Sequence, residues 1–552
     1  MPAVGLNEDQ LAAVVHRGSP LLVLAGPGSG KTRLIVHRIA HRLAGELRAE
    51  EVVAITFTNR AAAELRHRLD ALMGRPVDAR VGTFHWMCAR ILRRHADRAG
   101  LPPNFSVLSP RQARALFRDV ARELGYVEPG AWQALADAVS TWKNGGSWQA
   151  AGGADRIDPT AVQRVAERYT GRLRASRALD LDDLLWECRR MLEQDPELRV
   201  SLTRRIGELL VDEYQDTNPV QQAIVHLLAP DGGNVAAVGD DDQSIYGWRQ
   251  ASYTTMASFQ RDFPNARIIT LAQTYRSSKL ILRAAESLIR HNRDRFEKNL
   301  RTAQPAGSRP RCYVAQDERD EAEWVATSVS EVRERPSLKW EEIAILYRVN
   351  AQARVLEEAL VRRQIPYRVL AGRRFLERSE IRLCVAYLRL ALDLADDAAT
   401  RELLERVSGV GPVRVRRLAE EGSSRGLPLS QALAGARAVP AQLAAPLEAL
   451  ASRIRRVHEC RLEALPVVLD NAIAATVEDL AGSLSRDELE SAVEDIDELR
   501  SILTDMPRDL RTLRHLVDVL TLEEPTSGAA AGVNLLSLHA AKGLEFEAVF
   551  VT

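Results

Sequence analysis

One stretch near the N-terminus has the residue types and the spacing of a phosphate-binding loop. Glycines let backbone N–H groups approach a phosphate closely, and the N-terminus of a following helix adds favourable charge. In such a loop the lysine reaches the outer phosphates and the next hydroxyl holds a magnesium ion, which assigns these roles to Lys31 and Thr32. The sequence therefore predicts a nucleoside-triphosphate site on a run of consecutive residues: Ala25, Gly26, Pro27, Gly28, Ser29, Gly30, Lys31 and Thr32.

Two adjacent carboxylates, Asp212 and Glu213, directly follow an apolar run at residues 209–211. Carboxylates at the end of a strand suit phosphate hydrolysis, since one can hold magnesium through water and the next can polarise the attacking water. A lone Asp-Glu pair is a weak signal, but its place after an apolar run and downstream of a phosphate loop makes it a strong one. We assign Asp212 to the metal and Glu213 to the water.

Polar and aromatic residues follow the apolar run Val235–Gly239. Gln243 could sense a terminal phosphate. Tyr246, Trp248 and Arg249 suit a stacking platform for a single strand, because stacking tolerates every base and Arg adds a cation. The alternative is that Trp248 anchors this loop to the core.

Three more residues could contact a nucleotide. After the apolar run Arg267–Leu271, Tyr275 can stack on a base and Arg276 can face developing phosphate charge as an arginine finger does. Near the N-terminus, Asn7 and Gln10 have the spacing of a helix capping box. The amide of Gln10 could equally read an adenine edge, although the spacing alone favours the cap.

These residues need strands and helices that hold them at one edge of a sheet. Apolar runs at 21–24 and 52–57 predict further buried strands, and residues 81–85 predict a strand followed by a turn. These segments alternate with amphipathic helices, which indicates an α/β fold. Ligands bind at the carboxyl ends of strands in such sheets. The candidate contacts after the second and third strands are Phe57, Thr58, Asn59 and His85, although a core role explains Phe57 equally well.

The composition limits the classes of function. The 552 residues carry 75 Lys and Arg against 75 Asp and Glu, so any nucleic-acid contact must come from local grooves. The five cysteines lie far apart, without the close pair of a zinc or redox motif. The acidic N-terminal stretch lacks a signal-peptide core, and no apolar run approaches the length that spans a bilayer. We expect a soluble, cytoplasmic protein of several domains that does not contact a membrane.

Taken in chain order, these stretches resemble a superfamily 1A DNA helicase of the UvrD/Rep/PcrA type. The matching blocks are the phosphate loop, Thr56–Ala62, Gly82–His85, Leu179–Leu185, Val211–Asp216, Gly239–Arg249, Thr274–Ser278 and Leu538–Phe546. The resemblance implies an α/β fold of two RecA-like P-loop domains with parallel sheets, each with a mainly helical insertion. The expected parts are domain 1A at 1–100 and 200–276, insertion 1B at 101–199, domain 2A at 277–385 and 531–552, and insertion 2B at 386–530.

The resemblance also implies residue roles, with ATP and Mg²⁺ as cofactors. Gln10 becomes an adenine reader with Arg33 and Tyr275 as its stacking neighbours, and Glu545 lies near the ribose. The implied catalytic residues are Lys31, Asp212, Glu213, Gln243 and Arg276. The implied DNA contacts are Phe57, Thr58, Asn59, His85, Tyr246, Trp248, Arg249 and His539.

The activity implied by the resemblance is ATP-dependent 3′→5′ translocation on single-stranded DNA and unwinding at a junction with duplex DNA, in repair or recombination. Repair or replication proteins are possible partners, and a monomer or weak dimer in the bacterial cytoplasm is expected. The chain stops at Thr552, before the family's last arginine motif, so we expect a truncated domain 2A. Two alternatives remain open: an ATPase-deficient DNA-binding protein, and the motor half of a helicase–nuclease complex.

Overall fold

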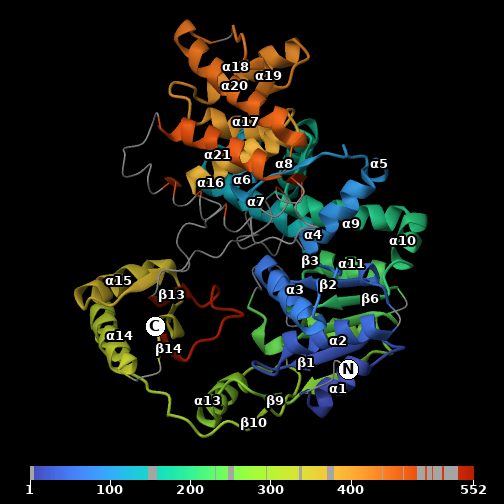
Figure 1. Ribbon diagram of the computed structural model, residues 1–552, viewed down its shortest axis with the longest axis vertical. Coiled ribbons are helices and arrows are strands. Elements are labelled where there is room, and N and C mark those ends of the chain that lie inside the picture. Colours follow the sequence, from blue (N-terminus) through green and yellow to red (C-terminus); the bar gives the residue numbers. More distant parts are fainter. Residues whose placement is uncertain are drawn as a thin grey trace. The chain divides into compact units, whose positions relative to one another are not determined.

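Figure 1 shows the computed structural model of the chain. It describes residues 5–45, 47–146, 158–230, 232–245, 254–293, 295–334, 338–369, 378–437, 439–463, 465–481, 492–493, 496, 500, 513–514, 517 and 532–552. The chain divides into two compact units. The first contains Met1–Gly307 and Arg382–Glu523, and the second contains Ser308–Ile381 and Glu524–Thr552. The four-part division expected from the sequence stays a prediction.

A six-stranded parallel sheet forms the centre of the first unit, in the order β3-β2-β6-β7-β1-β8. Its strands are β1 (Leu21–Ala25), β2 (Val52–Thr56), β3 (Arg80–Thr83), β6 (Glu208–Val211), β7 (Val235–Gly239) and β8 (Arg267–Leu271). Most of them are buried along their whole length, as expected for a parallel sheet covered on both faces. The strands predicted from the apolar runs at 21–24, 52–57, 209–211, 235–239 and 267–271 are confirmed, with ends that differ by at most one residue.

Helices cover both faces of this sheet (Figure 1). Side chains alternate between the faces of a strand, so Leu22 and Leu24 of β1 pack into one apolar cluster and Leu21 and Val23 into the other. The helices that contribute to the first cluster include α4 (Phe84–Arg94), α9 (Leu181–Gln194), α11 (Pro219–Leu228) and α12 (Thr254–Asp262). Those of the second are α1 (Glu8–Val15), α2 (Lys31–Gly45) and α3 (Asn59–Met73).

A helical insertion follows α5 (Ala96–Ala99). Its helices α6 (Pro110–Glu123), α7 (Pro129–Lys143) and α8 (Pro159–Ala175) share one apolar cluster. The short parallel pair β4 (Ser106–Val107) and β5 (Ala178–Leu179) adds Ala178 to this cluster, whereas α10 (Pro196–Thr203) packs on α9 and α11. The insertion therefore has its own core.

A buried ion cluster joins this insertion to the sheet domain. The Lys143 side chain is only 2% exposed, and its Nζ lies 3.0 Å from Asp180 Oδ2 and 2.7 Å from Asp183 Oδ1. Burial, together with the charge of Asp180, raises the pKa of Asp183 to about 7. Burial disfavours the charged form of a carboxyl group, and the negative charge of Asp180 adds to this effect at Asp183. Asn144, the next residue, accepts a hydrogen bond from Asn218 Nδ2 at 2.7 Å, which ties the insertion to the N-cap of α11.

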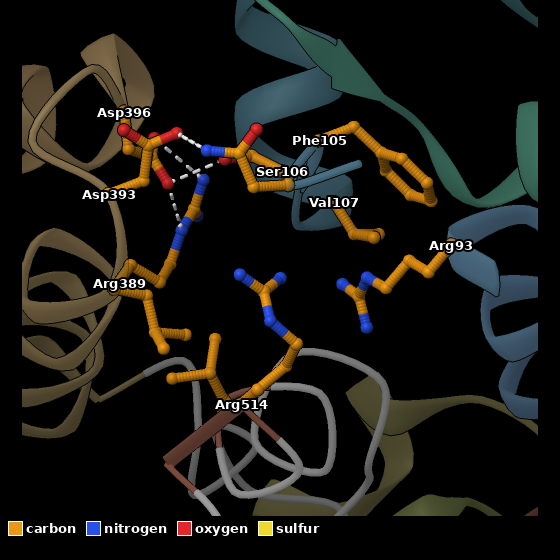
Figure 2. Close-up of a pocket in the computed structure, with 11 residues that line it drawn as sticks. Arg93, Phe105, Ser106, Val107, Arg389, Asp393, Asp396 and Arg514 are labelled. Carbon is orange, nitrogen blue, oxygen red and sulfur yellow. Dashed lines mark hydrogen bonds and ion pairs between the residues drawn. The ribbon is translucent and has the colours of Figure 1, made fainter. Parts of the chain in front are cut away.

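A second helical region begins at the boundary between the units and lies almost entirely in the first unit. Its helices are α16 (Ser379–Leu392), α17 (Asp397–Leu404), α18 (Pro412–Ser424), α19 (Leu429–Ala432), α20 (Ala444–Glu459) and α21 (Leu465–Ala481). Figure 2 shows a pocket where it meets the first insertion. There Arg389 pairs with Asp396 at 2.9 and 3.0 Å, and the Ser106 hydroxyl donates to Asp396 at 2.7 Å. The two helical regions therefore contact each other mainly through polar groups at this pocket.

The second unit is built around a smaller parallel sheet in the order β12-β13-β11-β14. Its strands are β11 (Ile343–Tyr347), β12 (Tyr367–Val369), β13 (Val533–Ser537) and β14 (Ala548–Val551), and α14 (Glu318–Arg333) and α15 (Ala353–Arg362) pack on them. Two parallel sheets flanked by helices confirm the predicted α/β class. Within the described residues, no helix has both the length and the apolar character needed to cross a membrane.

The Lys143 cluster gives a stability prediction. Lys143→Met leaves Asp180 and Asp183 buried without their cation, which should lower the free energy of unfolding by about 3–5 kcal/mol. Tryptophan fluorescence during urea unfolding should report this loss, because the Trp142 and Trp186 rings lie 4.8 Å apart near the cluster.

The matched control is Arg68→Met, which breaks an exposed pair with Glu64 on α3 and should cost less than about 1 kcal/mol. Equal losses in the two variants would show that burial of the Lys143 cluster adds nothing to its contribution.

Candidate functional site

The predicted phosphate loop lies between β1 and α2 and folds back on itself. Ser29 donates to the Gly26 carbonyl from its backbone N at 3.2 Å and from its hydroxyl at 2.7 Å. Gly28 and Gly30 have positive φ angles of 70° and 86°, which glycine adopts without strain. Lys31 is the first residue of α2, so the loop ends at a helix N-terminus, where backbone N–H groups favour an anion.

The structure brings Tyr275 and Arg276 against this loop, although they lie about 250 residues further along the chain. They follow the short strand β9 (Gln273–Thr274), which pairs with β10 (Arg301–Thr302). The Tyr275 N–H donates to the Gly28 carbonyl at 2.9 Å, and the Thr274 hydroxyl donates to the Pro27 carbonyl at 2.7 Å. The candidate arginine finger therefore lies beside the candidate phosphate site.

Gln10 is buried, and both the oxygen and the nitrogen of its side-chain amide form hydrogen bonds. Its Oε1 accepts from the Asn7 backbone N at 3.1 Å, so the predicted capping box is confirmed. Its Nε2 donates to the Ser29 carbonyl at 2.9 Å. Asn7 Nδ2 also donates to the Tyr275 hydroxyl at 3.0 Å. The capping box, the phosphate loop and Tyr275 thus form one hydrogen-bonded cluster beside the exposed Arg33. Recognition of adenine by Gln10 stays a prediction.

The two predicted carboxylates lie at the end of β6. The Asp212 N–H donates to the carbonyl of Ile55 on the neighbouring β2 at 2.8 Å. Glu213 has a φ angle of 50°, a left-handed conformation that is uncommon outside glycine and tends to occur at functional sites. This bend places Glu213 Oε1 4.0 Å from Lys31 Nζ. The sheet thus holds a carboxylate next to the lysine of the loop.

Gln243 lies at the end of β7 in the short 3₁₀ turn η5 (Asp241–Gln243). Its Nε2 donates to Asp240 Oδ2 at 2.6 Å, and the Asp240 N–H donates to Gln215 Oε1 at 3.0 Å. Gln215 Nε2 in turn donates to Glu213 Oε2 at 2.5 Å. Gln243 and Glu213 are therefore linked by a continuous chain of hydrogen bonds through two intervening residues.

Sequence reasoning assigned no role to Gln215 or Asp240, although both lie inside the sequence blocks that carried the resemblance. It also missed Arg295 and Lys298, which bind the aspartates before Gln243. No local pattern marks these two cations. Their segment contacts the site only through tertiary folding.

The predicted DNA contacts after β2 and β3 lie at adjacent positions, because these strands pair with Thr56 opposite Thr83. The Thr58 hydroxyl caps α3 by accepting from the Ala61 N–H at 3.1 Å. Phe57 is half-buried, which leaves both its core role and its base-contact role open. Asn59 begins α3, and His85 lies in the first turn of α4.

The remaining predicted contacts lie elsewhere. Tyr246, Trp248 and Arg249 are outside the described residues. His539 and Glu545 belong to the second unit and follow β13, the first half-buried and the second exposed.

The residues present fit a nucleoside triphosphate with magnesium. Among the described residues there is no group of three or more His, Cys, Asp and Glu side chains that could hold a metal by itself. Magnesium at nucleotides usually takes only one or two protein ligands and completes its shell with phosphates and water. Thr32 at the loop and Asp212 at the end of β6 offer that limited set.

Comparisons with known proteins identify the family of the chain. Residues 6–264 match the sequence model of the UvrD/REP helicase N-terminal domain, and residues 269–552 match that of the UvrD-like helicase C-terminal domain. The chain belongs to the UvrD/REP helicase family. It is 35% identical over 567 residues to a Staphylococcus epidermidis protein named ATP-dependent DNA helicase PcrA, covering 99% of this chain and 77% of that protein. A Staphylococcus aureus protein of the same name is 36% identical over 569 residues, with the same coverage.

In this UvrD/REP-family chain, the contact between the loop and β9 gives a prediction. A Cβ at Gly28 would lie 2.5 Å from Arg276 Cβ and 2.7 Å from Thr274 Oγ1. Gly28→Ala should therefore displace the loop and weaken binding of a fluorescent ATP analogue by at least about tenfold, a change of ~1.4 kcal/mol.

Gly18→Ala is the matched control. Gly18 has a φ angle of 83°, but nothing lies within 4 Å of its added Cβ. It should share the backbone strain of Gly28→Ala and keep nucleotide affinity close to that of the wild type. Equal weakening in both variants would attribute the effect to strain alone.

Proposed function

We propose that this chain is an ATP-dependent DNA helicase whose ATP hydrolysis is stimulated by single-stranded DNA. The observation that supports this most directly is an arrangement on one sheet. Lys31, Glu213 and Gln243 follow β1, β6 and β7. Four of the predicted DNA contacts follow the adjacent strands β2 and β3, namely Phe57, Thr58, Asn59 and His85. The site for the nucleotide and the site for single-stranded DNA would then lie along the same edge of one sheet.

Each residue at the nucleotide end has a role that its position allows. The N–H groups of the loop and of the first turn of α2 would bind the phosphates, and Lys31 would reach the outermost one. Glu213 would orient the attacking water and accept its proton, since it lies beside Lys31. Arg276, next to Gly28, would stabilise the charge that develops on the transferring phosphate.

Thr32 and Asp212 would hold magnesium, which supplies charge neutralisation at the phosphates when bound. Gln243 would respond to the terminal phosphate, and its hydrogen-bonded chain to Glu213 would connect that response to the water-orienting group.

The residues that follow β2 and β3 would bind one strand of DNA. Because β2 lies between β3 and β6, a shift at Asp212 and Glu213 reaches the segment Phe57–Asn59 across a single strand-to-strand contact. We propose 3′→5′ movement, unwinding at single-strand/duplex junctions and a role in repair or recombination as a monomer or weak dimer in the bacterial cytoplasm. Support for these finer points comes from the family and from relatives that are bacterial proteins named DNA helicases.

The test is ATP hydrolysis with and without single-stranded DNA. The wild type should be stimulated strongly, and Glu213→Gln should lower the stimulated rate by about 10²–10⁴-fold, as expected for loss of a catalytic base. Lys31→Ala should lose activity as well. The control is Glu64→Gln, which changes an exposed glutamate on α3 and should hydrolyse ATP at the wild-type rate.

Normal DNA binding without any stimulation in the wild type would contradict this function and favour an ATPase-deficient DNA-binding protein. With stimulation present, duplexes carrying a 3′ or a 5′ single-stranded tail would decide the polarity of unwinding.

A further inference from the structure

A lysine outside every predicted motif lies completely buried beside Gln243. The Lys298 side chain has 0% exposure, and its Nζ is 2.7 Å from Asp240 Oδ1 and 3.0 Å from Asp242 Oδ2. It also donates to Asp241 Oδ1. All three N–H donors of the ammonium group therefore have a carboxylate acceptor. Burial lowers the pKa of Lys298, but the neighbouring aspartates more than offset this and raise it overall, so the group is charged at neutral pH.

A second cation from the same segment binds the aspartates from the side. Arg295 donates through Nε and Nη2 to the two carboxylate oxygens of Asp242 at 2.7 and 2.6 Å, a bidentate pair. The Phe296 backbone N donates to Asp241 Oδ2 at 2.8 Å. Residues 295–298 thus hold the turn formed by residues 240–243, which we call the aspartate turn.

Asp240 is the junction of this network. Its Oδ1 accepts from Lys298, and its Oδ2 accepts from Gln243 Nε2 at 2.6 Å. Its backbone N–H donates to Gln215, which binds Glu213. Lys298 and the predicted phosphate sensor therefore share one carboxylate, and the water-orienting glutamate is two hydrogen bonds away from that residue.

The residues that follow Lys298 run along the phosphate loop. A Cβ on Gly26 would lie 2.6 Å from Leu300 Cδ2, so Leu300 packs directly on the loop. β10 then pairs with β9, and Gln304 Nε2 donates to the Tyr275 carbonyl at 2.9 Å. One continuous segment, 295–304, thus contacts the aspartate turn, the phosphate loop and the strand that leads to the arginine finger.

A contribution to the stability of the fold does not by itself explain why this cluster is charged. Burying a cation among carboxylates carries a large desolvation cost, and well-packed apolar residues often stabilise a fold equally well. A fully satisfied polar network does impose one geometry on its members, because each missed hydrogen bond is costly in a low-dielectric place. The cluster is thus suited to holding the aspartate turn at a defined position relative to the phosphate loop.

We propose that Lys298 is a positioning residue that acts through Asp240 to set the place of Gln243 at the phosphate site, and thereby couples ATP hydrolysis to strand binding. Lys298 itself touches no substrate. This proposal rests on the helicase function proposed above and assigns that site a further positioning residue, which belongs to the segment between β9 and α14.

Two variants separate positioning from simple structural support. Lys298→Met removes the cation at Asp240, whereas Arg295→Met removes a cation that binds only Asp242. Lys298→Met should lower the DNA-stimulated kcat by at least about tenfold with KM for ATP nearly unchanged, because displacing a catalytic group by ~1 Å can cost as much as 10²-fold. Arg295→Met should keep the wild-type ratio of stimulated to basal rate.

If Lys298→Met does not fold, Lys298→Met with Asp241→Asn takes its place. This double variant removes one positive and one negative charge, so it preserves the charge balance of the cluster while Asp240 still loses its cation. Its stimulated kcat should be lowered as in the single variant.

A second readout does not depend on catalysis. Hydrogen exchange at the Gln243 amide, which donates to the Asp240 carbonyl at 2.9 Å, should be faster in Lys298→Met and unchanged in Arg295→Met. A folded Lys298→Met with wild-type stimulation, or equal losses of stimulation in the two single variants, would overturn the proposal. A wild type without stimulation would instead contradict the helicase function, and the exchange rates would still decide whether Lys298 positions the aspartate turn.

Discussion

The parallel register of the six-stranded sheet is the constraint on which the rest of the first unit depends. It brings the carboxyl ends of all strands to one edge, so the loops after β1, β6, β7 and β8 converge there, and β2 and β3 continue the same edge. Residues separated by more than 200 positions, such as Gly28 and Arg276, are packed together as a direct result. The first helical insertion enters the chain between β3 and β6, so it interrupts none of the six strands.

Buried ion clusters occur where segments distant in sequence must meet at a fixed place. Lys143 joins the first insertion to α9, and Lys298 joins segment 295–304 to the aspartate turn. Arg38 does the same inside the sheet domain, where it binds Glu208 of β6 and the carbonyls at the end of α1. Apolar packing would hold these elements with similar energy but with a less defined geometry. The proposed function requires small shifts at the nucleotide site to reach the DNA contacts, and a defined geometry of the elements between them suits that requirement.

Local sequence patterns predicted the strands, the capping box and the phosphate loop, because these depend on neighbours within a few residues. Asn7 and Gln10 cap α1 as their spacing indicates. The second use of Gln10, its hydrogen bond to the Ser29 carbonyl, depends on how α1 packs beside the loop. The left-handed backbone of Glu213 likewise has no local signature, since a glutamate at this position would ordinarily be extended or helical.

The sequence by itself determined the α/β class and the chemical types at the site: a glycine-rich loop with its lysine, a carboxylate pair, an amide and an arginine. Only the tertiary structure decided which groups meet, and it added the Lys298 and Arg295 contacts to the aspartates before Gln243. The reason is physical. Periodicity and motif spacing describe short-range backbone preferences, whereas a contact between residues 58 positions apart depends on strand order and on desolvation of the charged groups, which no short stretch of sequence contains.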